Sequence, residues 1–232
     1  MPSILITGSN RGLGLEWTRQ YLQLGWQVHA TCRHPEEADE LHQLKRAHDN
    51  MSLFRLDVTR PDEINTVADQ LSDQAIDILV NNAGVYLEKF DKSTLGHFDY
   101  GDWEKTFRIN TLGPVRITQA FTKHVARSTR RLVVNISSHM GSIAEIESPG
   151  SYAYRSSKAA LNAATKGLAL ELQQQNVGLL LLHPGWVKTR MGGAGALFST
   201  QESVDGMRSV IDRFDMDISG AFYHFKGNVI PW

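Results

Sequence analysis

The stretch Thr7-Gly8-Ser9-Asn10-Arg11-Gly12-Leu13-Gly14 decides the fold of this chain. It follows the apolar run Ile4-Leu5-Ile6 and precedes a segment with helical spacing of apolar residues, which predicts a strand, a glycine turn and a helix. Glycines at these spacings let the backbone turn tightly and approach a pyrophosphate, and the next helix offers free N–H groups and its positive dipole end. A dinucleotide fits such a turn, but a glycine-rich turn also serves as a plain connector. The rest of the chain must decide between them.

Composition indicates an ordinary soluble protein. The chain has 232 residues, 41% of them hydrophobic, and shows no internal boundary, so we expect one domain over residues 1–232. A net charge of −1 with interspersed signs gives no footprint for nucleic acid or an anionic membrane. The single cysteine, Cys32, cannot form an internal disulfide, and the N-terminus lacks a signal or spanning segment. These features predict a cytoplasmic protein.

Strand-like and helix-like segments alternate along the chain, which is typical of an α/β fold. The expected strands cover residues 4–7, 27–32, 52–57, 77–81, 132–136, 177–183 and 221–225. The expected helices start with one whose apolar face carries Leu13, Trp17, Tyr21 and Leu24, and continue at 36–48, 62–74, 102–127, 152–175 and 201–214. Because several strands are apolar on both faces and the crossovers are right-handed, we predict a Rossmann-type, doubly wound parallel sheet of about seven strands. Its ligand crevice would lie at the carboxyl ends of the strands.

A second set of motifs lies further along the chain. Tyr154-Arg155-Ser156-Ser157-Lys158 opens a helix, and its tyrosine and lysine, four residues apart, share one helical face. Together with Ser137-Ser138, Asn81-Asn82-Ala83-Gly84, Asn110 and Pro184-Gly185, in this order and spacing, the chain resembles the short-chain dehydrogenase/reductase family along almost its whole length. The finer resemblance is to the sniffer-like carbonyl reductase and C-factor branch. It is carried by Ala30-Thr31-Cys32-Arg33, His183-Pro184-Gly185-Trp186-Val187-Lys188-Thr189 and Gly227-Asn228-Val229-Ile230-Pro231-Trp232.

The resemblance implies a catalytic tetrad of Asn110, Ser138, Tyr154 and Lys158. Tyr154 would protonate the substrate oxygen, or accept the proton in the reverse direction. An ammonium at ~4 Å in an effective dielectric near 20 is worth roughly 4 kcal/mol, so we expect Lys158 to lower the pKa of that phenol. In the family this lysine also holds the nicotinamide ribose. Tyr152 is a rival to Tyr154, but its position relative to Lys158 points it elsewhere on the helix.

The other tetrad members follow from alignment with the family. Ser138, rather than Ser137, takes the position that hydrogen-bonds the substrate carbonyl, and residues 139–151 form a loop about three residues longer than is usual in the family. Asn110 matches an asparagine that in the family anchors a water linked to the lysine. Because asparagine and the nearby Gly113 are poor interior helix residues, we expect a local kink there.

Cofactor choice depends on charge after the second strand. NAD enzymes of this fold carry an acid there, whereas this chain has Arg33, with Arg11 in the glycine turn, and both arginines suit a 2′-phosphate. We therefore expect NADPH/NADP, with NAD less favoured. Family resemblance places Asp57 at the adenine, Asn81 as support for the crevice and Thr189 near the nicotinamide amide or the phosphates. The full predicted cofactor set is Gly8, Asn10, Arg11, Gly12, Leu13, Gly14, Arg33, Asp57, Val58, Asn81, Ala83, Gly84, Tyr154, Lys158, Pro184, Gly185, Val187 and Thr189.

The expected function is an NADPH-dependent carbonyl reductase that acts on a small or aromatic ketone, aldehyde or quinone. The alternative is a dinucleotide-sensing or signalling protein of the same fold with little turnover. A glycine-rich, apolar lid is expected around residues 190–205, and the candidate walls of the substrate pocket are Tyr86, His139, Met140, Trp186 and Phe198. No histidine spacing indicates a metal site. In the family, helices matching 102–127 and 152–175 form the interface of a homodimer or homotetramer, although the small Ala159, Ala160, Ala163 and Ala164 could equally serve packing within one chain.

Overall fold

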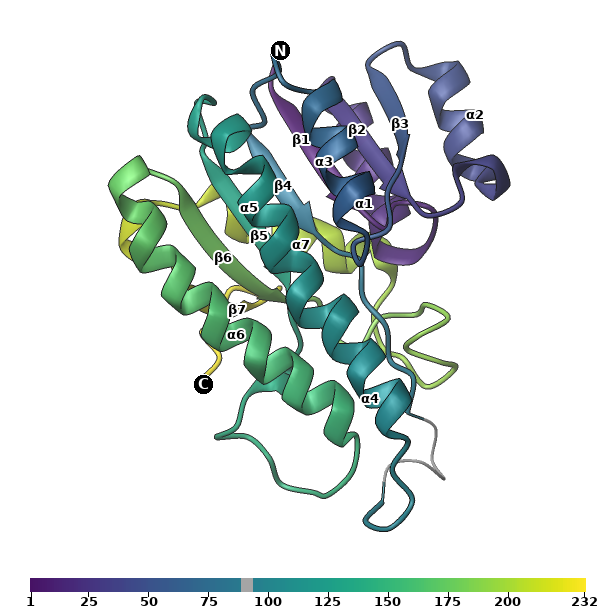
Figure 1. The fold of residues 1–232 in the computed structure, drawn as a ribbon, viewed down its shortest axis with the longest axis vertical. Coiled ribbons are helices and arrows are strands. Elements are labelled where there is room, and N and C mark those ends of the chain that lie inside the picture. The colour runs from purple at the N-terminus through teal and green to yellow at the C-terminus, as the bar shows by residue number, and fades with distance from the viewer. Residues whose placement is uncertain (89–93) are drawn as a thin grey trace.

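The computed structural model describes residues 1–88 and 94–232 and centres on a parallel sheet (Figure 1). Seven strands pair in the order β3-β2-β1-β4-β5-β6-β7, all parallel. They are β1 (Ser3–Thr7), β2 (Gln27–Cys32), β3 (Met51–Arg55), β4 (Ile78–Asn81), β5 (Leu132–Ile136), β6 (Gly178–His183) and β7 (Ala221–His224). The predicted doubly wound sheet is confirmed. Its strand order reverses between β1 and β4, which opens a crevice beyond their carboxyl ends.

Helices cover both faces of the sheet. On one face α1 (Gly12–Gln23), α2 (Asp39–Ala47) and α7 (Thr200–Asp212) contribute to one apolar core. On the other face α3 (Pro61–Gln70), α5 (Gly113–Ala126) and α6 (Tyr152–Leu172) contribute to a second core. Figure 1 shows α4 (Tyr100–Phe107) continuing into α5 along one line, with α6 beside them.

The strands face a core on each side, as their apolar composition predicts. In β1, Ile4 and Ile6 enter the core beneath α1 and α7, whereas Leu5 enters the opposite core, and all three are fully buried. The same alternation occurs in β4, where Ile78 and Val80 face one way and Leu79 the other. Alternate side chains point to opposite faces of a strand, so an apolar residue at every position requires cover on both faces.

The helix predicted over 102–127 is interrupted where a kink was expected. Residues Arg108–Leu112 form a π-helical turn between α4 and α5. Gly113 follows this turn against Val58, where an added Cβ would lie only 2.9 Å from the valine Cγ2. A π-turn often marks a functional position in a helix, and here it carries Asn110.

Several predicted helices differ from the observed ones in where they begin or end. The helix predicted over 36–48 begins at Asp39, after a short 3-10 turn at Pro35–Glu37, and the helix predicted over 62–74 ends at Gln70. Residues 200–205, placed in the lid by sequence, belong to α7, because Ser199 and Glu202 form a reciprocal capping box that starts this helix. The connection between β6 and α7 therefore spans 184–199.

We expect Gly14→Ala and Gly167→Ala to change the stability in opposite directions. A Cβ on Gly14 would lie 2.1 Å from the Gly8 carbonyl oxygen and 2.7 Å from Asn82 Nδ2, so the substitution should cost about 2 kcal/mol or more. Gly167 is exposed inside α6 with nothing within 4 Å of an added Cβ, so alanine should add up to about 1 kcal/mol. Urea unfolding measures both changes. Equal unfolding midpoints for Gly14→Ala and the wild type would contradict this account of the glycine turn.

Candidate active site

The glycine turn lies at the carboxyl end of β1 and leads directly into α1. Gly8 and Gly12 have positive φ of 70° and 56°, which side chains rarely adopt. The Asn82 amide, at the end of β4, donates to the carbonyl oxygens of Thr7 (2.9 Å) and Gly8 (3.2 Å). This amide therefore ties the turn to the neighbouring strand. Sequence reasoning quoted Asn82 only as part of a motif and gave it no role.

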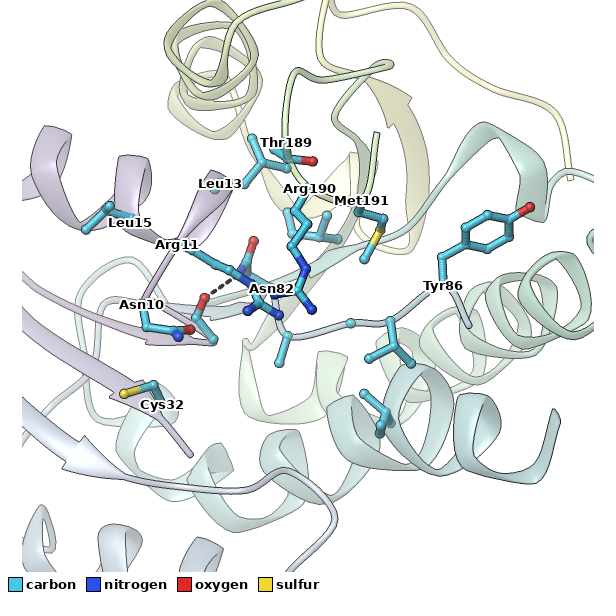
Figure 2. A pocket seen from close by; sticks show the side chains of 18 of the residues that line it. Asn10, Arg11, Leu13, Leu15, Cys32, Asn82, Tyr86, Thr189, Arg190 and Met191 are labelled. Carbon is cyan, nitrogen blue, oxygen red and sulfur yellow. Dashed lines mark hydrogen bonds between the residues drawn. The ribbon is translucent and has the colours of Figure 1, made fainter. Parts of the chain in front are cut away.

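A cavity of about 630 Å³ opens beside this turn (Figure 2). In Figure 2 it extends from Cys32, the last residue of β2, to Tyr86, in the segment after β4. The predicted site residues that line it are Gly8, Asn10, Arg11, Gly12, Leu13, Gly14, Arg33, Asp57, Val58, Ala83, Gly84, Tyr154, Lys158, Pro184 and Thr189. The structure therefore brings most of the predicted cofactor set to one cavity.

Three predicted cofactor residues support the cavity from behind. Asn81 is buried and donates to Asn135 Oδ1 at 2.8 Å, which joins β4 to β5. Val187 is buried and pairs with Phe198 as an isolated bridge. Gly185, with φ of 81°, packs against the Phe225 ring so closely that a Cβ would come within 2.7 Å. None of the three lines the cavity as the structure describes it.

Four arginines line the cavity; Arg19 is ion-paired with Glu40, and the other three are one more than the sequence argument identified. Arg11 and Arg33 were expected, and Arg190 joins them from the loop after β6; Figure 2 shows its side chain directed into the cavity. Burial, then Arg190, then Arg33 lower the pKa of Arg11. Among the described residues none of the three guanidinium groups forms an ion pair. The only sequence signal for Arg190 is its position directly after Thr189.

Two further predicted residues have fixed orientations at the cavity. Asp57 Oδ1 accepts hydrogen bonds from the backbone N–H and the hydroxyl of Thr59, both at 2.8 Å. Thr189 Oγ1 accepts from the backbone N–H of Gly192 at 3.2 Å. A Cβ on Gly12 would lie 3.3 Å from Thr189 Cγ2, so the loop after β6 packs against the glycine turn.

Tyr154, Lys158 and Ser138 meet where α6 begins beside the end of β5. Ser138 hydrogen-bonds Tyr154, and Lys158 Nζ lies 5.8 Å from the centre of the tyrosine ring. The lysine donates to the Ile136 carbonyl oxygen at 2.9 Å. Ser137 donates to Asn162 Oδ1 at 2.6 Å, and Ser137, not Ser138, is among the residues that line the cavity. Ser138 is therefore the serine that contacts Tyr154, and its role toward a substrate stays a prediction.

Burial controls the titration of both groups. It raises the pKa of Tyr154 to about 12, against a smaller lowering by the hydrogen bond with Ser138. It lowers the pKa of Lys158 to about 8. The expectation that Lys158 lowers the pKa of Tyr154 is wrong for this structure, because desolvation of the phenol outweighs the stabilising contacts. Tyr154 is consequently a protonated acid at neutral pH.

Asn110 is buried in the π-turn and holds the segment after β4. Its Oδ1 accepts from the Val85 backbone N–H at 2.8 Å, and its Nδ2 donates to the Val85 carbonyl at 2.8 Å and to Ser157 Oγ at 3.1 Å. Gly84 lies between the catalytic candidates, since an added Cβ would be 3.4 Å from Asn110 Oδ1 and 3.7 Å from Lys158 Nζ.

Of the five candidate walls of the substrate pocket, only Tyr86 lines the cavity. Phe198 packs against Phe225 with ring centres 4.9 Å apart. Trp186 donates its indole N–H to the Gly192 carbonyl at 2.7 Å, and His139 pairs with Glu145 in the loop over 142–151. Leu87 and Met191, which the sequence argument did not select, line the cavity instead.

Comparison with known proteins assigns the family. A family model described as short chain dehydrogenase matches residues 2–196, and the chain belongs to this family of oxidoreductases. C-signal of Myxococcus xanthus is 43% identical over 157 residues, which are 68% of this chain and 93% of that protein. Among the described residues, no helix is both long and apolar enough to cross a membrane.

Solved structures similar to this chain include two carbonyl reductases. The NADPH-bound carbonyl reductase from chicken fatty liver superposes with a TM-score of 0.93 and 33% identity, covering 100% of this chain and 99% of that one. The carbonyl reductase Sniffer of D. melanogaster gives a TM-score of 0.93 and 34% identity, covering 100% of both chains.

Proposed function

We propose that this protein is an NADPH-dependent carbonyl reductase that reduces a small or aromatic ketone or aldehyde to the alcohol, or a quinone to the hydroquinone. The observation that carries the proposal is that Tyr154 and Lys158 line the same cavity as Arg11 and Arg33, which form no ion pair with any described residue. The names of the two similar solved structures, one of them bound to NADPH, support it.

The residues present fit the cofactor. The Gly8–Gly14 turn is packed too closely for side chains, since an added Cβ would lie 3.0 Å from Ala83 Cα at Gly8 and 2.1 Å from the Gly8 carbonyl oxygen at Gly14. Its backbone therefore lines the cavity directly, and the N-terminus of α1 faces the cavity, as a pyrophosphate site requires. The guanidinium groups of Arg11, Arg33 and Arg190 have no carboxylate partner in the part of the chain that the structure describes, which suits a polyanion. A nicotinamide cofactor, when bound, supplies the hydride. Arg11 and Arg33 would hold the 2′-phosphate, Asp57 and Val58 the adenine side, and Lys158 and Thr189 the nicotinamide side.

The protein's own part in the reaction is proton transfer and orientation. Tyr154 would donate its hydroxyl proton to the substrate oxygen, and Ser138 would hydrogen-bond the same oxygen. The Lys158 ammonium would return a proton to the Tyr154 phenolate and hold the cofactor ribose. Asn110 would keep Val85, and with it the floor of the cavity, in place. The rise in the pKa of Tyr154 keeps the phenol protonated at neutral pH, which is the state that carbonyl reduction needs.

Cofactor preference tests the arginines directly. Charge-assisted hydrogen bonds are worth about 1.5 to 3 kcal/mol, so Arg11→Ala or Arg33→Ala should weaken NADPH roughly ten- to a hundredfold and leave NADH nearly unchanged. Cys32→Asp should reduce the preference for NADPH over NADH further, because a carboxylate there repels the 2′-phosphate of NADPH but accepts hydrogen bonds from the ribose hydroxyls of NADH. The measurement is kcat/KM for each cofactor.

Arg19→Ala is the matched control for this prediction. Arg19 lines the same cavity but is ion-paired with Glu40 at 2.8 Å, so its loss should change the preference little. A wild type that prefers NADH, or arginine variants that lose both cofactors equally, would overturn the assignment of NADPH.

The similarity to C-signal favours a second candidate, a dinucleotide-binding signalling protein with little turnover. The retained Tyr154 and Lys158 argue for the enzyme. Turnover separates the two: NADPH binding without oxidation across quinones, aldehydes and ketoesters would favour signalling.

For the assembly, we propose a homodimer or homotetramer through the region of 102–127 and 152–175. The small side chains of Ala159, Ala160, Ala163 and Ala164 on α6 are not fully buried within the chain, which supports a close approach by a second copy.

A further inference from the structure

A buried carboxylate caps the helix that carries Tyr154. Glu88, from the connection after β4, is only 7% exposed. One of its oxygens accepts the Ala153 backbone N–H at 3.0 Å and the other accepts the Tyr154 backbone N–H at 2.9 Å. The residue that precedes α6, Ser151, has a left-handed backbone and provides no side-chain cap. The cap is therefore supplied by a residue 65 positions earlier in the chain.

This placement is electrostatically favourable for Glu88. The first N–H groups of a helix lack partners within it and form the positive end of its dipole, so a carboxylate there gains charge-assisted hydrogen bonds. Within the described part of the chain no lysine or arginine pairs with Glu88. The free N–H groups at the start of α6 thus compensate for the burial of the Glu88 carboxylate, and the carboxylate in turn supplies their hydrogen-bond acceptors.

Glu88 is the last of several contacts between one short segment and the start of α6. Tyr86 packs edge-on against the Tyr154 ring with centres 5.0 Å apart, and its hydroxyl lies 2.7 Å from Ser151 Oγ. Val85, one residue earlier, is held through both of its backbone polar groups by Asn110. The segment 85–88 therefore joins the π-turn to the first turn of α6, and residues 85–87 line the cavity.

We propose that Glu88 is a positioning residue for Tyr154. The proposal rests on the proposed function, because it concerns the proton donor of that reaction. The far end of α6 is anchored by Ala169 and Leu172 in the core, so loss of the cap would loosen the first turn and leave the helix in place. Lys158 lies one turn further on and has its own contact with Ile136. Loss of Glu88 should therefore displace the phenol from Ser138 and leave cofactor binding intact.

The first test compares Glu88→Ala and Glu88→Gln with the wild type. Misplacement of a catalytic group by about 1 Å can cost up to a hundredfold, so we expect Glu88→Ala to lower kcat at least roughly tenfold. The Kd for NADPH should change less than about twofold. Glu88→Gln keeps one carbonyl acceptor and should recover part of kcat. Glu147→Ala, an exposed acid in the loop before α6, is the matched control and should behave as wild type.

The second test asks whether Glu88 acts through Tyr154. If it does, Glu88→Ala should cause almost no further loss of kcat when added to Tyr154→Phe, since the displaced hydroxyl is already absent. Amide hydrogen exchange at Ala153 and Tyr154 should accelerate in Glu88→Ala, while exchange in the later turns of α6 stays unchanged.

The outcomes separate this proposal from the proposed function. Equal losses of kcat in the wild-type and Tyr154→Phe backgrounds, parallel losses of NADPH affinity, or unchanged exchange at the two amides would each overturn the positioning role. A wild type that binds NADPH and reduces no carbonyl compound overturns the proposed function itself, and with it any role in that reaction; exchange then still reports whether Glu88 orders the turn.

Discussion

Tyr154→Phe is expected to lower kcat for carbonyl reduction by on the order of a hundredfold or more, because it removes the proton donor and little else. Burial keeps the pKa of Tyr154 at about 12, so the wild-type phenol carries its proton throughout the neutral range. Phenylalanine retains the ring that packs against Tyr86. NADPH affinity and the free energy of unfolding should therefore stay close to wild type. NADPH oxidation at saturating cofactor, with a binding titration in parallel, measures both effects.

Tyr152→Phe is the control that the chain itself offers. Tyr152 lies in the same turn of α6, but its ring packs against Phe98, 5.2 Å away between centres, and it does not line the cavity. Its kcat should match wild type. Unchanged turnover in Tyr154→Phe would remove this residue from the mechanism. A large loss of kcat in Tyr152→Phe would show that the effect is not specific to the hydroxyl of Tyr154.

The architecture could be predicted from sequence because its signals are local. Continuous apolar runs such as Leu179-Leu180-Leu181-Leu182 can be buried only inside a sheet covered on both faces, and β6 is buried in this way. The kink near Asn110 was also predictable, because a polar side chain and a glycine occur together within a helical pattern.

The features that sequence reasoning missed depend on contacts between distant segments. Phe198 was a candidate wall of the substrate pocket, but Phe225 and Lys226, which follow β7, pack against its ring. Glu88 resembles any surface acid until its hydrogen bonds to α6 are known. The pKa of Tyr154 was predicted from one neighbouring charge, whereas the degree of burial, which no local pattern encodes, dominates it.

Lys158→Met is expected to raise stability while it damages function. Burial lowers the pKa of this lysine from its ordinary 10.5 to about 8, so below pH 8 folding must bury an ammonium at a cost of up to about 3 kcal/mol. Methionine cannot donate the hydrogen bond to the Ile136 carbonyl oxygen, and this loss of about 1 kcal/mol offsets part of the gain in stability. At pH 7 the free energy of unfolding of the variant should therefore exceed that of the wild type by about 1 to 2 kcal/mol.

The sign of the pH dependence follows from the same shift. Between about pH 8 and 10.5 the unfolded chain binds a proton at Lys158 that the folded chain has released, so wild-type stability gains with pH in this window. The advantage of Lys158→Met should shrink across it. Urea unfolding of both proteins near neutral pH and at the upper end of the window measures this convergence, and a less stable variant at pH 7 would contradict the burial cost.

We expect Lys158→Met to lower activity and cofactor affinity, although it raises stability. If the ammonium holds the cofactor ribose and supports proton transfer, the variant should lose roughly a hundredfold or more in kcat and bind NADPH more weakly. Wild-type kcat should fall as pH rises through about 8, where the ammonium is lost, and the variant should lack this alkaline limb. Lys166→Met, an exposed lysine on the same helix, is the matched control. Normal NADPH affinity in Lys158→Met would contradict the binding role, because the ammonium that is expected to hold the cofactor ribose would then contribute nothing to binding.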